Sequence, residues 1–343
     1  MVEHPLKLAG AYGSPYSLKM RSVLRYRHIP FTWVLRDSRL DDMPPVPVRL
    51  IPVIAFPDAD GNYTESMIDS SPLIDRLERE VPGRSLTPTS PAIEFIDRLI
   101  EDYGDEWVTK AMFHYRWYYD EAINKAKKLL PLDMNMQVSD RGWEKGQEFI
   151  AQRQINRRAL VGCTDENRPV VEASYERLLD ILDARWHEGT FLLGDRPGRG
   201  DFGIFGQLRQ LVMWDPVSAR VALERSARTV NWVERMDDLS WWPITDEQAG
   251  WCDAATVPEP TKALLTEIGR TYVPFMLANA AALSSGAAEV VLAIDGHEYR
   301  QGPFPYQGKC LVWLREHYAA LAPDARGEVD TLLAGTGCEM LFA

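Results

Sequence analysis

The stretch that decides the fold is Ala11-Tyr12-Gly13-Ser14-Pro15-Tyr16-Ser17-Leu18-Lys19-Met20-Arg21. It follows an apolar run, residues 6–11, whose side chains alternate as they do in a β-strand. Gly13 and Pro15 break that alternation, and a helical pattern begins at Ser17. A serine hydroxyl therefore stands between a strand and a helix, beside backbone N–H groups that have no partner inside the helix. Such a helix end favours an anion, and serine is also a preferred N-cap there.

The elements that follow predict the rest of this first domain. A second strand is expected over 31–35, and a proline-containing loop over 36–49 forbids a long helix. A third strand over 50–56 and a fourth over 62–67 flank the turn at 58–61. A helix then opens near Asp69, with Pro72 at its first turn. This order of strands and helices is typical of a thioredoxin-like fold.

The segment Ser14-Pro15-Tyr16-Ser17 has the spacing of the glutaredoxin motif Cys-Pro-Tyr-Cys, with oxygen in place of both sulfurs. Serine forms no redox-active thiolate, but it can donate a hydrogen bond to the thiolate of another molecule. Together with Ile51-Pro52 and Asp69-Ser70, this segment makes the chain similar to the glutathione S-transferases whose catalytic residue is a serine. The three matches span about eighty residues at the family's mutual spacing.

The resemblance implies roles for these residues. Ser14 is the expected catalytic residue, and Tyr16 and Ser17 compete with it for contact with the glutathione thiol. Ile51 would pair through its backbone with the cysteine of glutathione, ahead of a cis bond to Pro52. Further glutathione contacts are expected from Asp69 and Ser70, which would hold the γ-glutamyl group, and from Arg39 or Arg49, which would replace the family's usual lysine at the glycine carboxylate.

The whole chain is expected to combine an α/β domain with an all-α domain. The resemblance divides it into a thioredoxin-like glutathione-binding domain over 1–82, an all-α domain over 91–240 and an extension over 241–343. The extension is expected to be helical, with a β-hairpin near 289–300 around an Asp-Gly turn. It lies beyond the resemblance, and packing or a lid are its expected roles. An aromatic cluster in the all-α domain suggests a pocket for the second substrate at Met112, Tyr115 and Tyr119, although such a stripe is also typical of a core.

A glycine-rich stretch over 198–203 satisfies the spacing G-x-G-x-x-G of dinucleotide-binding loops. That interpretation needs a strand–helix–strand unit, and the flanking segments are both helical in pattern. The resemblance instead makes Asp201 the structural cap of a buried helix, with Gly198 where the family has serine or threonine.

Composition limits the partners. The chain has 343 residues and a net charge of −12, which disfavours nucleic acid or an anionic membrane surface as the main partner. Its four cysteines have no metal-ligand spacing, so no metal is expected, and their scatter suits a reducing cytoplasm. The longest weakly polar stretch, 273–285, is too short to span a bilayer.

The resemblance implies a cytoplasmic homodimer that uses glutathione as co-substrate and activates its thiolate for attack on an apolar or aromatic electrophile. The alternative is a non-catalytic binding or assembly module with the same fold. A glutaredoxin-like reductase or a transferase with a catalytic cysteine is disfavoured, because serine occupies both thiol positions.

Overall fold

The computed structural model describes residues 4–343, so the first three residues of the predicted domain 1–82 lie outside it. The N-terminal domain is built on a four-stranded mixed sheet, in the order β2-β1-β3-β4. Its strands are β1 (Leu6–Gly10), β2 (Phe31–Leu35), β3 (Val53–Pro57) and β4 (Tyr63–Ile68). β1 is parallel to β2 and antiparallel to β3, and β4 is antiparallel to β3. The predicted thioredoxin-like domain is confirmed.

Two helices complete this domain, α1 (Pro15–Tyr26) and α2 (Ser70–Glu80). α1 begins two residues before the predicted Ser17, with Pro15 in its first turn after the N-cap Ser14, and α2 starts directly after Asp69. Leu18, Val23 and Leu24 of α1 are buried, as the apolar spacing requires. No regular helix joins β2 to β3, because the prolines between residues 44 and 52 hold that connection irregular.

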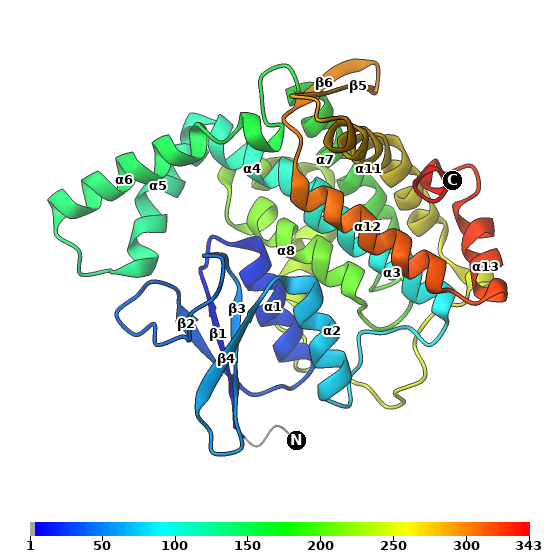
Figure 1. Ribbon diagram of the computed structural model, residues 1–343, viewed down its shortest axis with the longest axis horizontal. Helices are drawn as coiled ribbons and strands as arrows, with labels where there is room; N and C mark the ends of the chain where they lie inside the picture. The colour runs from blue at the N-terminus through cyan, green and yellow to red at the C-terminus, as the bar shows by residue number, and fades with distance from the viewer. Residues whose placement is uncertain (1–3) are drawn as a thin grey trace.

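Helices make up the middle of the chain. They are α3 (Pro91–Tyr103), the π-helical segment η1 (Gly104–Val108), α4 (Thr109–Tyr118), α5 (Asp120–Met134), α6 (Asp140–Ile155), α7 (Arg168–Glu188), α8 (Arg199–Met213), α9 (Pro216–Arg225) and α10 (Ala227–Met236), with the 3-10 turn η2 (Ala159–Val161). In Figure 1, α8 runs through the centre of the molecule and α5 and α6 project as an arm. α6 ends at Ile155, and the chain continues as turns.

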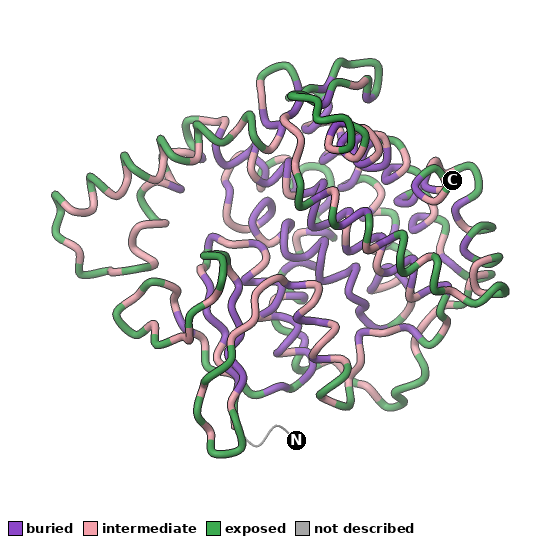
Figure 2. Tube along the Cα trace, in the orientation of Figure 1, coloured by how far each residue is buried: buried purple, intermediate pink, exposed green. Residues whose placement is uncertain are grey.

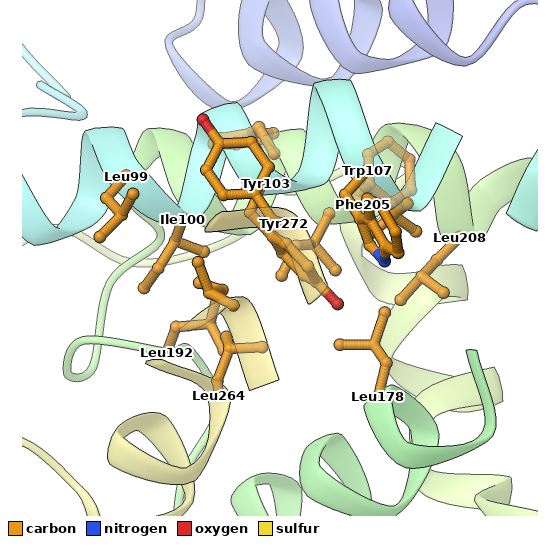
Figure 3. Packing of buried hydrophobic residues seen from close by; sticks show 14 of the residues in the cluster. Leu99, Ile100, Tyr103, Trp107, Leu178, Leu192, Phe205, Leu208, Leu264 and Tyr272 are labelled. Carbon is orange, nitrogen blue, oxygen red and sulfur yellow. The ribbon is translucent and has the colours of Figure 1, made fainter. Parts of the chain in front are cut away.

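The core lies where α3, α8 and the extension meet. Figure 3 shows Tyr103 of α3 and Trp107 of η1 packed with Phe205 of α8, Leu178 of α7 and Tyr272 of the extension. Burial follows the same arrangement, since α8 is almost wholly buried whereas the side chains of α6 are exposed or half-buried (Figure 2). The predicted cap at Asp201 is present: its carboxylate accepts from the N–H groups of Gly198 and Leu192 at 3.0 Å each.

The extension adds η3 (Ala254–Thr256), α11 (Glu259–Ser285), the strands β5 (Val290–Ile294) and β6 (His297–Gln301), α12 (Pro305–Ala320), α13 (Pro323–Leu333) and η4 (Cys338–Leu341). The hairpin is confirmed, and Asp295 and Gly296 form its turn with φ of 52° and 75°. α12 crosses in front of α3 and above α2 (Figure 1). No helix among the described residues is both long and apolar enough to cross a membrane.

Candidate functional site

A cavity of about 500 Å³ lies where three parts of the chain meet. The N-terminal domain contributes Ile51-Pro52, the segment 69–72 and Tyr16 to its lining. α3 and η1 contribute a polar face, and the hairpin and α12 close the opposite side. The volume falls within the range of sites for small ligands, about 300–1,000 Å³. The extension is therefore a wall of this cavity.

The N-terminal wall brings together two of the predicted motifs. The peptide bond between Ile51 and Pro52 is cis, as predicted, and both residues line the cavity. Asp69 lies beside them with φ of 78°, a left-handed conformation that an aspartate holds only when its surroundings fix it. Ser70 is buried and opens α2, so backbone N–H groups of the first turn lie next to it.

At the start of α1, the two predicted serines lie outside the cavity lining. Ser14 is the N-cap of α1, and its hydroxyl accepts a hydrogen bond of 3.3 Å from the N–H of Ser17. Ser17 is fully buried, and neither serine belongs to the cavity lining. Tyr16 does line it, but its hydroxyl donates to the carbonyl of Asp105 at 2.7 Å. Burial holds the pKa of Tyr16 well above its usual range, so it stays protonated.

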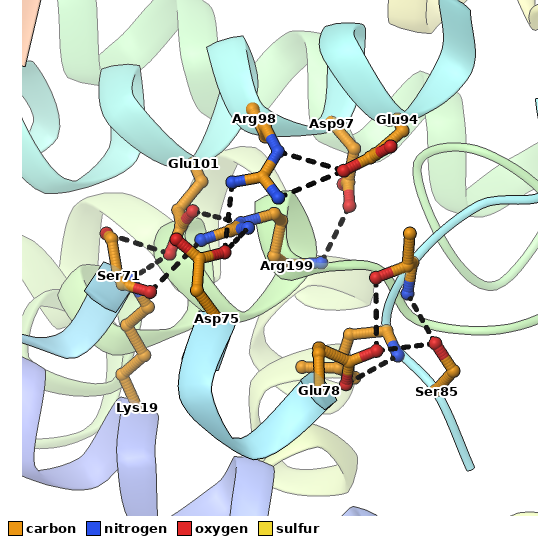
Figure 4. Close-up of polar contacts among 12 residues, drawn as sticks. Lys19, Ser71, Asp75, Glu78, Ser85, Glu94, Asp97, Arg98, Glu101 and Arg199 are labelled. Atoms are coloured by element: carbon orange, nitrogen blue, oxygen red, sulfur yellow. Dashed lines mark hydrogen bonds and ion pairs between the residues drawn. The ribbon is translucent and has the colours of Figure 1, made fainter. Parts of the chain in front are cut away.

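A buried ion-pair network fastens α1 to α3 beneath the cavity (Figure 4). Lys19 Nζ contacts Glu101 at 2.7 Å and Asp105 at 2.5 Å, and it also donates to the Ser70 hydroxyl at 3.3 Å. Arg199 of α8 pairs with Glu101 and, at 2.8 Å, with Asp75. Burial opposes ionisation of Glu101, but the charges of Arg199 and Lys19 outweigh it and lower its pKa to about 2.

The other carboxylates of the cavity have no cation within ion-pair distance among the described residues. Asp102 Oδ1 accepts from the hydroxyl of Tyr272 at 2.5 Å, and burial raises the pKa of Asp102 to about 7. Burial also holds the pKa of Glu106 well above its usual range, and the nearby Asp102 and Asp105 add to this shift. Asp69, whose pKa burial raises as well, contacts a hydroxyl and no cation.

The wall from the extension reaches both motifs. Tyr306 donates its hydroxyl to Asp69 Oδ2 at 2.8 Å, and Gln307 donates its amide to the carbonyl of Glu106 at 2.9 Å. Further along α12 the lining is mostly apolar, with Cys310, Trp313 and Leu314. Burial raises the pKa of Cys310 far above its usual value, which leaves that thiol protonated and unsuited to nucleophilic chemistry. No three His, Cys, Asp or Glu side chains among residues 4–343 are grouped so that they could hold a metal ion.

Several predicted site residues lie elsewhere. Arg39 contacts Gln137 at the tip of the α5–α6 arm, and the exposed Arg49 pairs with Asp37 at 2.7 Å. Met112 and Tyr115 are buried on the side of α4 that faces α7, where Tyr115 packs edge-on against Tyr175 with ring centroids 5.3 Å apart. Tyr119 stacks on Tyr115 at 5.7 Å. The structure does not bring these five residues to the cavity.

The polar face of α3 and η1 is the part of the site that sequence reasoning missed. Its members recur three or four residues apart on one helical stripe, and all line the cavity: Arg98, Glu101, Asp102, Asp105, Glu106 and Thr109. The available signal was the spacing of four carboxylates, at residues 101, 102, 105 and 106, on one helical face. The π-helical turn inside this stripe is a second mark, because such turns are frequent at functional sites.

The comparison with known families concerns the N-terminal part of the chain. The model of the family "Glutathione S-transferase, N-terminal domain" matches residues 8–85. This range contains α1, α2 and all four strands of the mixed sheet, except the first two residues of β1. The N-terminal domain is a glutathione S-transferase domain. The family description names no thiol-contacting residue, so the serine type of this transferase domain stays a prediction. A comparison with curated proteins found no match.

The solved structures that match the chain include several bacterial proteins. A glutathione S-transferase-like protein from Pseudomonas syringae has a TM-score of 0.43 and 16% identity, covering 69% of this chain and 67% of that one. A glutathione S-transferase from Rhodospirillum rubrum F11 has the same score and identity, covering 75% and 97%. One from Methylobacterium radiotolerans, in complex with glutathione sulfonate, has a TM-score of 0.35 and 21% identity, covering 71% and 99%.

Proposed function

We propose that this protein binds glutathione along the N-terminal wall of the cavity and stabilises its thiolate for reaction with a second substrate. The observation that carries the proposal is that Ile51, Asp69 and Ser70 line one cavity, within a domain of the glutathione S-transferase family. A homodimer and an apolar or aromatic second substrate stay predictions from the resemblance.

Each residue has a role that its chemistry supports. Asp69 presents a carboxylate to the α-ammonium of the γ-glutamyl group, and a charge-assisted hydrogen bond of this kind is stronger than a neutral one. The first turn of α2, with the hydroxyl of Ser70, offers N–H and O–H groups to the neighbouring carboxylate. The backbone of Ile51, which lines the cavity just before β3, would pair with the peptide groups of the cysteine.

Stabilisation of the thiolate falls to the start of α1. A free thiol has a pKa of about 8.5, so holding it mostly ionised at neutral pH takes on the order of 2–3 kcal/mol. A hydrogen bond to a charged group supplies about 1.5–3 kcal/mol, and a helix N-terminus adds about 0.3–1 kcal/mol. The Ser14 hydroxyl accepts from the Ser17 N–H, so its own hydrogen is free to be donated to the thiolate.

The test is calorimetric titration of glutathione into the native protein and into Ser70→Ala. Binding in the micromolar to millimolar range, weakened about tenfold or more by the substitution, is expected from the loss of a hydrogen bond to a charged group. Ser285→Ala, at the exposed end of α11, is the matched control and should bind as the native protein does. Absence of binding at millimolar glutathione would overturn the proposal.

A non-catalytic binding module is the second candidate, and one contact favours it. The hydroxyl of Tyr306 already donates to Asp69, and Lys19 donates to Ser70, so both γ-glutamyl residues have partners within the chain. A protein of this kind would bind glutathione weakly and would show no turnover with a panel of electrophiles under conditions where binding is saturated. Turnover that depends on Ser14 would exclude it.

A further inference from the structure

Six carboxylates line the cavity, and only half of them are matched by cations among the described residues. Asp75, Glu101 and Asp105 are matched by Lys19, Arg98 and Arg199 through the ion pairs of the buried network. We call the remaining carboxylates, Asp69, Asp102 and Glu106, the unmatched group. They lie along the polar face of α3 and η1 and at the start of α2, facing α12 across the cavity.

Two further acceptors point to a ligand with donor groups. The Oδ1 atom of Asp105 and the Oε1 atom of Gln307 have no hydrogen-bond partner among the described residues, although the two residues are only 5% and 3% exposed. Both residues line the cavity, Asp105 from η1 and Gln307 from α12. A buried acceptor without a partner is costly, and a bound N–H donor would give each of these acceptors the partner that it lacks.

The cations near the unmatched group are already engaged. Lys110 Nζ donates to Gln301 Oε1 at 2.6 Å and lies 4.0 Å from the centre of the Phe275 ring. Arg98 and Arg199 are held by Glu94, Asp75 and Glu101. Lys309 is exposed on α12 and lies over the Trp313 ring. Among the described residues that line the cavity, Lys110 is therefore the one cation that no carboxylate pairs with, and Gln301 already engages it. The unmatched group has no cation to balance it, and burial raises the pKa of each of its carboxyl groups. A ligand that brings a cation would favour their ionised forms.

Apolar side chains also line the cavity. Phe304, Trp313 and Leu314 come from the extension, and Pro72 and Leu50 come from the N-terminal domain. An apolar or aromatic body fits against such a wall, and aromatic faces also attract cations. The cavity thus combines apolar side chains with a row of hydrogen-bond acceptors on α3 and η1.

We propose that the cavity, beside the unmatched group, takes a ligand that carries a protonated amine on an apolar or aromatic body. The ammonium lies between Asp102, Glu106 and the free acceptors of Asp105 and Gln307, and the apolar body packs on Trp313 and Leu314. The claim that this amine is the second substrate of a transferase rests on the proposed function. The claim that the cavity binds the amine does not, because none of the proposed contacts involves glutathione. An anionic compound of the same size brings neither a cation for these carboxylates nor a donor for these acceptors, so it binds more weakly.

The test compares three probes of matched size, 2-phenylethylamine, 2-phenylethanol and 3-phenylpropanoate. Each is titrated calorimetrically into the full chain at pH 7.5, with and without saturating glutathione. We expect the amine to bind at least about tenfold more tightly than the alcohol, because one charge-assisted hydrogen bond accounts for such a ratio, and the carboxylate to bind most weakly. Glu106→Gln and Asp102→Asn should each reduce the preference for the amine, and together they should abolish it.

The control is Glu234→Gln, an exposed carboxylate on α10, which should leave all three affinities unchanged. Equal binding of amine and alcohol, or a preference that survives the double substitution, overturns the inference. A preserved amine preference in a protein that fails to bind glutathione supports the amine site and overturns the transferase proposal alone. Thermal unfolding of each variant establishes that the cavity is intact.

Discussion

The six carboxylates that line the cavity form two halves, three matched by cations and three not. In the matched half, Lys19, Arg98 and Arg199 neutralise every carboxylate, and the ion pairs join α1, α2, α3 and α8 (Figure 4). In the unmatched half, Asp69 and Asp102 meet only the hydroxyls of Tyr306 and Tyr272. A buried charge is tolerated when it is paired, so the first half holds the fold together. The second half keeps acceptors that the fold does not use.

The largest effect is expected where the matched half is broken. Lys19→Met removes the only cation shared by Glu101 and Asp105, and leaves Asp105 without a cation within ion-pair distance in the described chain. Breaking a buried ion pair in this way costs about 3–5 kcal/mol. Chemical denaturation at pH 7.5 measures the loss in the free energy of unfolding.

The matched control is Lys262→Met, which removes an exposed pair with Glu259 at 2.6 Å. Exposed pairs of this kind are worth about 0–1 kcal/mol. If both lysine substitutions cost the same, the network under the cavity does not fasten the domains, and the contrast between the two halves has no consequence for stability.

The opposite sign is expected in the unmatched half. In the folded chain burial raises the pKa of Asp102 to about 7, from 3.8, so the fold retains a proton that the unfolded chain loses. Stability contributed at this position therefore falls as pH rises from about 4 to 7 and is constant above 7. Asp102→Asn removes the titration, keeps an acceptor for Tyr272, and should stabilise the protein by about 1–3 kcal/mol above pH 7.

Denaturation of the native protein and of Asp102→Asn at intervals between pH 4 and pH 8.5 measures this effect. The gap between the two curves should be small at pH 4 and open over the next three pH units. Asp324→Asn, on the exposed start of α13, is the control for loss of a carboxylate. A gap that is already full at pH 4 would show that Asp102 is not held protonated by its surroundings.

A smaller effect is expected at the contact between the walls. Tyr306→Phe removes the hydrogen bond to Asp69 and should cost about 1 kcal/mol of stability. The freed carboxylate becomes available to an ammonium, so glutathione should bind several-fold more tightly in calorimetry. Tyr318→Phe on the same helix removes an equivalent bond to Asp330, and it should lower stability without changing affinity. Weaker glutathione binding in Tyr306→Phe would make Tyr306 part of the binding site and not its competitor.

The comparison also separates what the sequence predicts from what it does not. The wall from the N-terminal domain is encoded locally: Pro52 carries its cis bond, Asp69 starts a helix, and the strand order follows from short apolar runs. Asp201 is predictable for the same reason, because a cap and the N–H groups it serves are neighbours in the chain. Each of these features needs only a few adjacent residues.

The opposite wall is not encoded in this way. Tyr306 and Gln307 reach the cavity through contacts with residues more than two hundred positions away, and no local pattern indicates which face of α12 meets α3. The aromatic stripe at Met112 and Tyr115 has the spacing of a buried helix face, and spacing alone does not say which neighbour covers it. In the structure that neighbour is α7, and the cavity faces the polar stripe one turn earlier.

The smallest effect on stability is expected at Ser14, which lies in neither half. Ser14→Gly keeps the N-terminus of α1, because glycine is only a few tenths of a kcal/mol poorer than serine as an N-cap. Any change in the chemistry of bound glutathione then reports the hydroxyl itself. The thiolate absorbance of bound glutathione, followed against pH, should show the thiol pKa rising by about one to two pH units if Ser14 donates to it.

Tyr16→Phe separates the remaining alternative. Tyr16 lines the cavity, whereas its hydroxyl already donates to the carbonyl of Asp105, so serving a thiolate would require that bond to break. We therefore expect the thiol pKa in Tyr16→Phe to match the native protein. A rise in Tyr16→Phe and none in Ser14→Gly would reverse the assignment, reducing Ser14 to a helix cap. It would also place the reacting sulfur deeper in the cavity, against η1, because Tyr16 contacts that segment and Ser14 does not.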